Sequence, residues 1–209
     1  MPHHRPTFQQ ERELLAAGYT AVVGVDEAGT GAFAGPVVAG AIILPLASRL
    51  GELDDSKKKT PAARERLFEQ LRESGSSWAV GEASVEEIAL LGLRPANELA
   101  MRRAIEKITH ADFALVDAWT IPSLSIPQRG IIHGDALVKS IAAASIIAKV
   151  TRDRMMRALH EQFPAYDFDV HKGYGTKAHL AAMKKLGLSE AHRVNWGNRL
   201  AQQKTSYFD

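Results

Sequence analysis

Apolar and polar positions follow one another along the chain in blocks that predict strands and helices. β-Branched and apolar runs, some of them alternating with polar residues, predict five strands, at residues 21–28, 35–44, 77–84, 113–119 and 130–136. Helical patterns fill much of the remainder, at residues 8–17, 60–74, 85–91, 95–108 and 136–160. Strands that first follow each other and then alternate with helices favour an α/β domain, with a mixed five-stranded sheet flanked by helices.

Length and composition fit one globular domain with a tail. Of the 209 residues, 45% are apolar and 24% charged, which is ordinary for a folded protein. We place the domain at residues 1–187 and a tail at 188–209, with a helical pattern in the tail to about Gln203. The absence of a long apolar run and of a signal-peptide pattern predicts a cytoplasmic protein without a membrane partner.

Two further counts narrow the chemistry. There is no cysteine, which excludes disulfides, thiolate zinc sites and a cysteine nucleophile. The net charge of +2 is too small to identify a nucleic-acid partner by itself. Any metal ion must therefore be held by oxygen or imidazole.

The glycine-rich stretch after the first predicted strand does not read as a nucleotide-binding loop. A dinucleotide fingerprint needs G-x-G-x-x-G before a helix, whereas Gly29, Gly31 and Gly35 have another spacing and precede a strand. A Walker-type loop needs a lysine after its last glycine, and residues 22–40 contain none.

Acidic residues instead stand where three predicted strands end. Asp26 and Glu27 close the first strand, Asp117 ends the run at 113–117, and Asp135 ends the short fifth strand just before the long helix. Functional groups gather at strand ends in α/β sheets, so we expect these four side chains to converge. The alternative is that each strand has simply ended and its acids are solvated.

Converging carboxylates would call for cations. Four of them within several ångströms repel one another, and two divalent ions would cancel the charge. Oxygen ligands suit Mg²⁺ or Mn²⁺ rather than zinc. A pair of such ions about 3.5–4 Å apart displaces an oxygen at phosphorus, so the acids indicate phosphodiester hydrolysis.

Five segments, in order and spacing, carry a family resemblance. They are GVDEAGTGAFAGPVVAGAIIL, LDDSKK, ALVDAW, HGDALVKSIAAASIIAKVTRDRMM and HKGYGTKAH, which together span most of residues 20–186. They resemble the signature segments of type 2 ribonuclease H, the ribonuclease HII family. The resemblance implies a ribonuclease H-like fold, and it assigns the catalytic and metal-binding roles to Asp26, Glu27, Asp117 and Asp135.

The same resemblance implies an activity and its substrates. The expected enzyme is an endonuclease that cleaves the RNA strand of RNA–DNA hybrids and incises 5′ of a ribonucleotide embedded in duplex DNA. The products would carry a 3′-hydroxyl and a 5′-phosphate, the partners would be these two nucleic acids, and the chain is expected to be a monomer.

Substrate contacts are expected on three segments. Tyr174 lies between two glycines, and the resemblance makes it the ring that stacks beside the scissile junction, although it could also be a turn filler. The backbone of residues 29–31 could read the ribose 2′-hydroxyl. Basic residues on the long helix could contact phosphates or could simply be solvated. The full set of expected substrate-binding residues is Gly29, Thr30, Gly31, Lys57, Ser145, Lys149, Arg152 and Tyr174.

Thr30 departs from the family pattern. The family usually has arginine or lysine between the two glycines, and the threonine looks more like the related ribonuclease HIII group. One alternative is therefore an enzyme restricted to hybrids. Another is a non-catalytic nucleic-acid-binding module on the same fold, which is disfavoured because all four acids are present.

Overall fold

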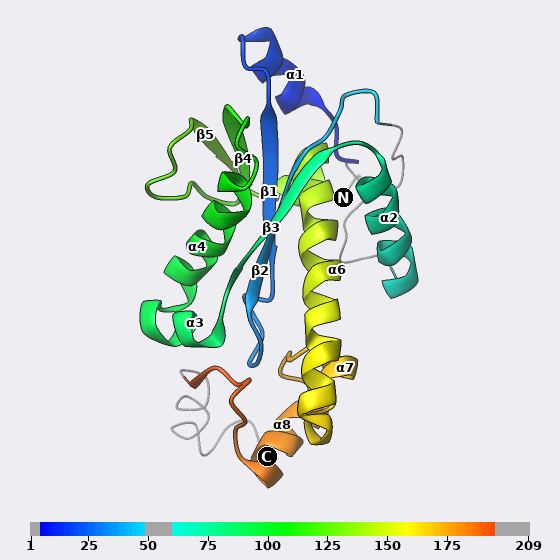
Figure 1. Cartoon of the computed structure of the whole chain (residues 1–209), viewed down its shortest axis with the longest axis vertical. Helices are drawn as coiled ribbons and strands as arrows, with labels where there is room; N and C mark the ends of the chain where they lie inside the picture. Colours follow the sequence, from blue (N-terminus) through cyan, green and yellow to red (C-terminus); the bar gives the residue numbers. More distant parts are fainter. Residues whose placement is uncertain (1–4, 49–59, 195–209) are drawn as a thin grey trace.

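The computed structural model describes residues 5–48 and 60–194. Within them, five strands form one sheet in the spatial order β3-β2-β1-β4-β5 (Figure 1). The β1–β2 and β2–β3 pairs are antiparallel, and the β1–β4 and β4–β5 pairs are parallel. The strands are β1 (Val22–Ala28), β2 (Val37–Ile43), β3 (Ser77–Ala83), β4 (Phe113–Asp117) and β5 (Gln128–Ile131). The predicted mixed five-stranded sheet is confirmed.

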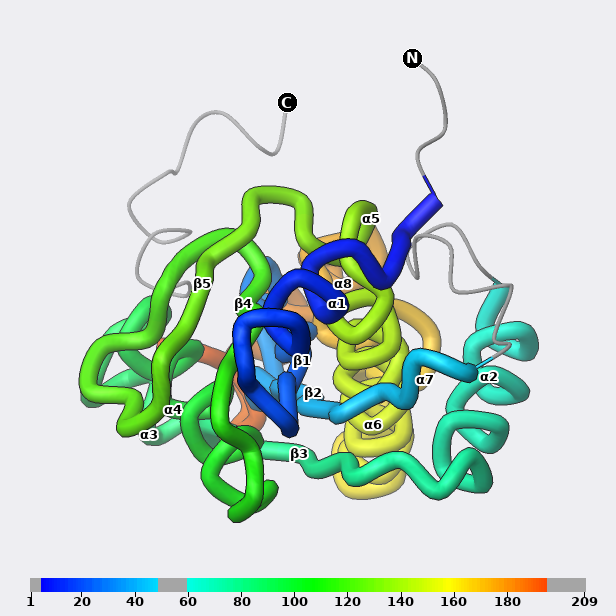
Figure 2. Tube along the Cα trace, turned by 90° about the horizontal axis from the view of Figure 1, so that it is seen from above, coloured from blue at the N-terminus to red at the C-terminus, as the bar shows by residue number. Residues whose placement is uncertain are grey.

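Helices cover both faces of this sheet. Figures 1 and 2 show the long helix α6 along one face, with α2 beside it, and α3 and α4 on the other face. The helices are α1 (Gln9–Ala16), α2 (Pro61–Glu73), α3 (Val85–Leu91), α4 (Leu93–Glu106), α5 (Gly134–Leu137), α6 (Lys139–Gln162), the 3₁₀ helix η2 (Pro164–Tyr166), α7 (Phe168–His171) and α8 (Lys177–Leu186). Thr60 caps the start of α2, because its side chain accepts a hydrogen bond from the Ala63 amide.

The sheet buries a separate apolar layer on each face. Val25 packs with Met101 on the α4 side, and Ile42 packs with Ile147 on the α6 side. Helix α6 comes very close to the strands at Gly24, where an added Cβ would lie 2.3 Å from the Ser140 carbonyl carbon. Since side chains alternate along a strand, Asp26 faces α6 as Gly24 does.

The fifth strand and the start of the long helix differ from the prediction. β5 ends at Ile131, and His133 has a left-handed backbone with φ of 58°. That turn redirects the chain into the short helix α5, which ends at Leu137. Val138 is extended and separates α5 from α6. Residues 130–136 are therefore not one strand, and residues 136–138 do not belong to α6.

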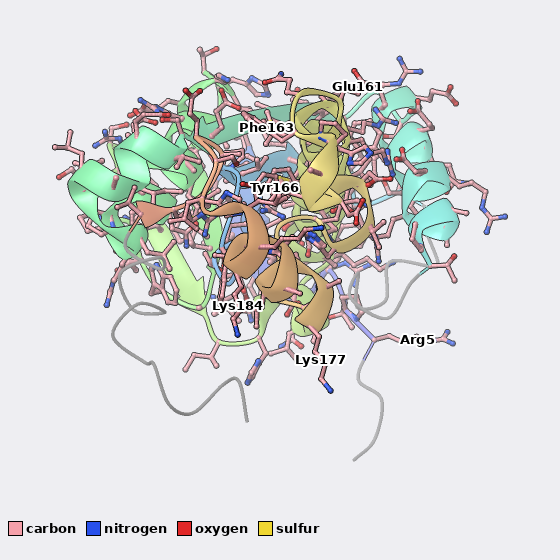
Figure 3. All side chains as sticks on the ribbon, turned by 90° about the horizontal axis from the view of Figure 1, so that it is seen from below. Arg5, Glu161, Phe163, Tyr166, Lys177 and Lys184 are labelled. Atoms are coloured by element: carbon pink, nitrogen blue, oxygen red, sulfur yellow. The ribbon has the colours of Figure 1, made fainter. Side chains whose placement is uncertain are left out.

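The chain after α8 packs back onto the domain. Ala191, His192 and Arg193 are buried, and His192 forms a β-bridge with Ala34 at the end of the glycine-rich loop. Figure 3 views this end of the molecule, with Tyr166 near the centre. The predicted domain boundary at residue 187 thus cuts through a packed unit. The predicted helix to Gln203 falls mostly on residues 195–209, outside the described residues.

None of the helices in residues 5–48 and 60–194 combines the length and the apolar character that crossing a bilayer requires.

Candidate active site

Three acidic side chains meet at the carboxyl ends of two adjacent parallel strands. The parallel register pairs Val25 of β1 with Val116 of β4, so the next residues along each strand, Asp26 and Asp117, lie at the same level. Glu27 follows directly. Carboxylate oxygens of Asp26, Glu27 and Asp117 all lie within 4.8 Å of one another. We call these three residues the carboxylate group.

Asp26 is the buried member of the carboxylate group, with 3% of its surface exposed. Burial raises its pKa well above the ordinary value, and the negative charges of Glu27 and Asp117 raise it further. Hydrogen bonds from Ser145 and from the Glu27 amide, 2.7 Å from Asp26 Oδ1, act in the opposite direction. A cation bound here would stabilise the ionised form of all three carboxyl groups.

Asp135 reaches this region from α5 rather than from a strand end. It is buried, with 7% exposed, and it lies in the only turn of α5. The preceding amide, of Gly134, donates a 2.7 Å hydrogen bond to Asp117 Oδ1. Within the described residues, the trio held within 4.8 Å does not include Asp135. Three of the four acids predicted to converge therefore lie together, and Asp135 follows Gly134, whose amide bonds to Asp117.

The glycine-rich loop after β1 is a tight turn that needs a glycine at its first position. Gly29 has a φ of 97°, and an added Cβ would lie 2.0 Å from Arg152 Nε. Thr30 is half-buried, whereas Gly31 is exposed with nothing within 4 Å of an added Cβ. The backbone around Gly31 is consequently open to a ligand.

Arg152 holds this loop from beneath and is fully buried. Its nitrogens donate to the carbonyls of Ala34, Pro36 and Lys172, at 2.9–3.0 Å. The prediction that Arg152 contacts phosphate is therefore wrong, because the guanidinium has no exposed surface and is occupied by backbone oxygens. Burial lowers the pKa of Arg152. Its N–H groups join the glycine-rich loop to the backbone at Lys172.

Ser145 and Lys149 have different environments on α6. Ser145 is buried and donates to the Asp26 carboxylate, so the structure places it behind the acids and not at a surface where substrate would lie. Lys149 keeps 22% of its side chain exposed, and its Nζ lies 2.5 Å from Asp153 Oδ1. Burial lowers the pKa of Lys149.

Tyr174 lies beside the glycine-rich loop. It forms a β-bridge with Ala32, and its half-buried ring has Lys149 Nζ 5.5 Å and the Arg152 guanidinium 5.3 Å from its centroid. The Tyr174 ring thus lies next to both the loop and Lys149. Lys57 falls outside the described residues.

Arg193 was not singled out by the sequence pattern. It is fully buried, and its guanidinium donates to the carbonyls of Thr30, Gly35 and Pro36, at 2.9–3.1 Å. Burial, together with the nearby positive charge of Arg152, lowers its pKa to about 9. A lone arginine in a polar tail gives no periodic signal, so its role depends on tertiary contacts.

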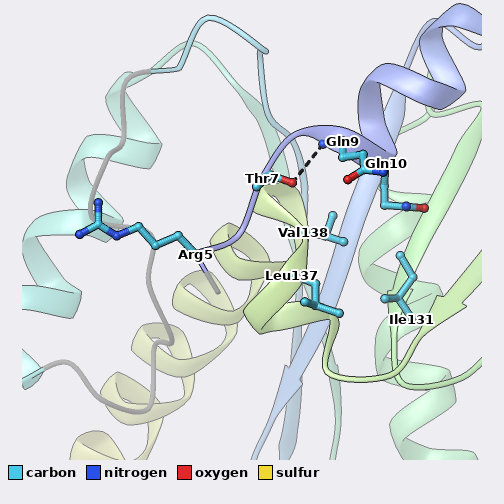
Figure 4. A pocket seen from close by; sticks show the side chains of 7 residues that line it. All are labelled: Arg5, Thr7, Gln9, Gln10, Ile131, Leu137 and Val138. Atoms are coloured by element: carbon cyan, nitrogen blue, oxygen red, sulfur yellow. Dashed lines mark hydrogen bonds between the residues drawn. The ribbon is translucent and has the colours of Figure 1, made fainter. Parts of the chain in front are cut away.

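Two other features lie away from the carboxylate group. A cavity between the start of the chain and α5 has no carboxylate in its lining (Figure 4), which consists of Arg5, Thr7, Gln9, Gln10, Ile131, Leu137 and Val138. His160, Asp167 and Asp169 also lie close together, but both acids are exposed, and His160 Nδ1 already lies 3.1 Å from Asp169 Oδ1.

Comparison with known proteins agrees with this geometry. The family model for ribonuclease HII matches residues 23–199. Ribonuclease HII of Desulfitobacterium hafniense is 50% identical over 187 residues, which are 89% of this chain and 72% of that protein.

Solved structures share the fold. The ribonuclease HII of Archaeoglobus fulgidus, in a complex with PCNA, matches with a TM-score of 0.75 and 24% identity, over 89% of this chain and 98% of that one. Bst ribonuclease HIII in complex with Mn²⁺ matches with a TM-score of 0.63 and 18% identity, over 81% and 64%. With three acids at the ends of β1 and β4 and half of its residues shared with a named relative, the chain belongs to the ribonuclease HII family of endonucleases.

Proposed function

We propose that this chain cleaves the RNA strand of RNA–DNA hybrids and incises 5′ of a ribonucleotide embedded in duplex DNA, leaving a 3′-hydroxyl and a 5′-phosphate. The observation that carries the proposal is the carboxylate group, with buried Asp26 held against Glu27 and Asp117 within 4.8 Å. Buried like charges destabilise a fold unless a ligand offsets them, so their presence here favours a catalytic role.

The donor set suits Mg²⁺ or Mn²⁺. All of its atoms are carboxylate oxygens, which these hard cations prefer, and the related Bst ribonuclease HIII has been crystallised with Mn²⁺. Asp26, Glu27 and Asp117 would hold two such ions, with Asp135 completing the set from α5. Bound there, divalent cations supply an activated water and stabilise the leaving oxygen.

The protein's own groups orient the acids and the substrate. Ser145 fixes one oxygen of Asp26, and the Gly134 amide fixes Asp117. The open backbone at Gly31 would read the ribose 2′-hydroxyl, and the Tyr174 ring would stack beside the scissile junction. The contacts of Lys57 and Lys149 with backbone phosphates stay a prediction, as do the monomeric state and the cytoplasmic location.

Thr30 favours a second candidate, an enzyme that cleaves hybrids and leaves single embedded ribonucleotides intact. Its side chain cannot donate a charged hydrogen bond to phosphate, and the two arginines beneath the loop are buried. A hybrid offers many binding registers, whereas a single junction offers one. Loss of one anchor should therefore affect the junction substrate more.

One experiment tests both candidates. End-labelled duplexes, one a full hybrid and one with a single embedded ribonucleotide, are incubated with the protein in Mg²⁺, in Mn²⁺ and in chelator. We expect cleavage of both substrates with either metal and none in chelator. Asp26→Asn should abolish cleavage, because it removes charge from the group that binds the cations.

Glu106→Gln is the matched control, since it removes one negative charge from the exposed surface of α4. Cleavage in chelator, or a wild-type rate for Asp26→Asn, would disprove the metal-dependent mechanism. Cleavage of the hybrid alone would select the second candidate.

A further inference from the structure

Two buried histidines beyond the carboxylate group form a direct hydrogen bond. His179 of α8 and His192 of the following segment are almost inaccessible to solvent, and their Nε2 atoms lie 3.1 Å apart. Two imidazole nitrogens can share a hydrogen bond only when one of them carries a proton and the other does not. One ring therefore donates to the other, and the remaining hydrogen-bond partners of the two rings determine which one is the donor.

Backbone groups assign that direction. The Ser189 amide donates to His192 Nδ1 at 2.9 Å, and an amide can only donate, so the His192 proton is on Nε2. His192 Nε2 then donates to His179 Nε2, which leaves the His179 proton on Nδ1. That nitrogen lies 3.0 Å from the carbonyl oxygen of Tyr174. A single chain of donors consequently runs from Ser189 through both rings to Tyr174.

A third histidine supports the same arrangement from the side. The Gly173 amide donates to His171 Nδ1, and His171 Nε2 donates to the Tyr166 carbonyl at 2.6 Å. The His171 ring stacks on His179, with 4.2 Å between centroids and 16° between planes. The Gly173 amide, just before Tyr174, and the Tyr174 carbonyl are thus both bonded to imidazole nitrogens.

We propose that His179 and His192 are positioning residues, whose directed hydrogen bonds hold the Tyr174 backbone so that its ring stands at the correct distance from the substrate. The inference rests on the proposed function of Tyr174 as the ring beside the scissile junction. Tyr174 also forms a β-bridge with Ala32 of the glycine-rich loop, so a shift of its backbone would affect that loop as well.

A packing role alone makes a different prediction. His179 and His192 also contact the Phe168 ring, with centroid distances of 5.7 and 5.5 Å. If they only filled space, any side chain of similar volume would serve, and the position of the nitrogen atoms would not matter. If they position Tyr174, the donor that faces its carbonyl must be retained.

Asparagine and glutamine separate these roles. In His179→Asn the amide nitrogen occupies the place of Nδ1 and can still donate to Tyr174, whereas in His179→Gln the amide lies near Nε2 and reaches only His192. We expect kcat on the single-ribonucleotide duplex to fall about tenfold in His179→Gln, the equivalent of one lost hydrogen bond, and much less in His179→Asn. His110→Gln, at an exposed site, is the control.

The decisive readout is the same substitution in a Tyr174→Ala background. If His179 acts through Tyr174, His179→Gln should cause no further loss of activity there. Equal losses in the two amide variants, or a tenfold loss that persists without the tyrosine ring, would overturn the inference. Nitrogen-15 NMR of the wild-type imidazoles tests the geometry without substitutions. It should show the proton on Nδ1 of His179 and on Nε2 of His192, and the reverse tautomers would overturn the inference.

The wild type on the same duplex separates this test from that of the proposed function. A wild type that cuts no substrate in Mg²⁺ or Mn²⁺ refutes the proposed function and, with it, the positioning role. A wild type that cuts normally leaves the His179 variants to decide the inference alone.

Discussion

Two neighbouring regions of the molecule bury polar groups in opposite ways. The carboxylate group brings like charges together at the ends of β1 and β4, and burial first, then the charges of Glu27 and Asp117, raises the pKa of Asp26. The second region, here called the buried anchor, consists of Arg152, Arg193, His171, His179 and His192. Its nitrogens meet backbone carbonyls, backbone amides or one another, and hold the loops in one arrangement.

The two regions differ in role, because the first is suited to bind cations and the second holds the loops in place. Carboxylates that repel one another are favourable only with a cation, so the first region sacrifices stability for ligand binding. Donors that satisfy carbonyls cost little once buried, and they prevent the loops from moving. Substitutions in the first region should therefore lower activity without lowering stability. Substitutions in the second should lower stability, and those of His179 and His192 should also lower activity through Tyr174.

The largest expected contrast is between the two ends of β4. Asp117→Asn should lower kcat by about a thousandfold, because metal-ion catalysis supplies several kcal/mol, while leaving the free energy of unfolding unchanged or higher. Asp112→Asn makes the same chemical change at the start of the strand, where the carboxylate accepts hydrogen bonds from Thr20 and Ala21. It should retain activity and lose about 1 kcal/mol of stability. Cleavage assays measure kcat, and urea unfolding measures stability. If the two variants lost activity and stability to the same extent, the two ends of β4 would not differ in role.

Within the buried anchor, Arg193 should have the largest effect on stability. Arg193→Met leaves the carbonyls of Thr30, Gly35 and Pro36 without a charged donor, at a cost of about 3 kcal/mol in the free energy of unfolding. Arg193→Lys should recover part of that loss. Arg102→Met, at a half-buried site on α4 where the arginine pairs with Glu106, should cost less than about 1 kcal/mol in the same urea titration. A methionine variant as stable as the wild type would contradict the structural role.

Mild acid, below about pH 6.5, should lower the stability that the buried anchor contributes. Burial above all lowers the pKa of His179 to about 4, against 6.5 in the unfolded chain; the hydrogen bond to the Tyr174 carbonyl opposes this shift, and His171 and His192 add repulsion once they are protonated. Between these values the unfolded chain binds more protons, so stability is full above pH 6.5 and falls as the pH drops. This group contributes at most about 1.4 kcal/mol per pH unit.

His171 and His192, whose pKa values burial also lowers, act in the same direction. Urea unfolding from pH 7 to pH 5 should show a shallower pH dependence in His179→Asn than in the wild type. Identical slopes would mean that His179 is not buried in its neutral form.

The smallest expected effect is at Thr30, where the two regions meet. Arginine there would add a charge-assisted hydrogen bond to phosphate, so Thr30→Arg should speed cleavage of the single-ribonucleotide duplex about tenfold and change hybrid cleavage less. Thr30→Val, which adds no charge, is the control. An unchanged ratio of the two rates would show that the backbone at Gly31 and the Tyr174 ring suffice.

The sequence could predict the carboxylate group better than the buried anchor. Asp26 and Asp117 close apolar strand runs, and the parallel register of those strands brings them together. Asp135 was misplaced on a strand, because the left-handed turn at His133 has no sequence pattern. Arg152 looked like a surface cation on a helix and is buried, because carbonyls from the loop at 34–36 and from Lys172 need its donors. Such contacts join segments that are distant in the sequence, and the periodicity of apolar residues does not reveal them.

The central claim, that the carboxylate group is built to bind cations, is tested most directly by thermal unfolding of the wild type and Asp26→Asn with and without Mg²⁺. In chelator, replacing the carboxyl group that is buried beside two other acids should stabilise the variant by about 1 kcal/mol, which raises its Tm by about 2–4 °C. Mg²⁺ should raise the Tm of the wild type and leave that of the variant almost unchanged, because a ligand stabilises only the state that binds it. A variant that melts below the wild type in chelator, or an equal rise in Tm with Mg²⁺ for both proteins, would contradict the claim.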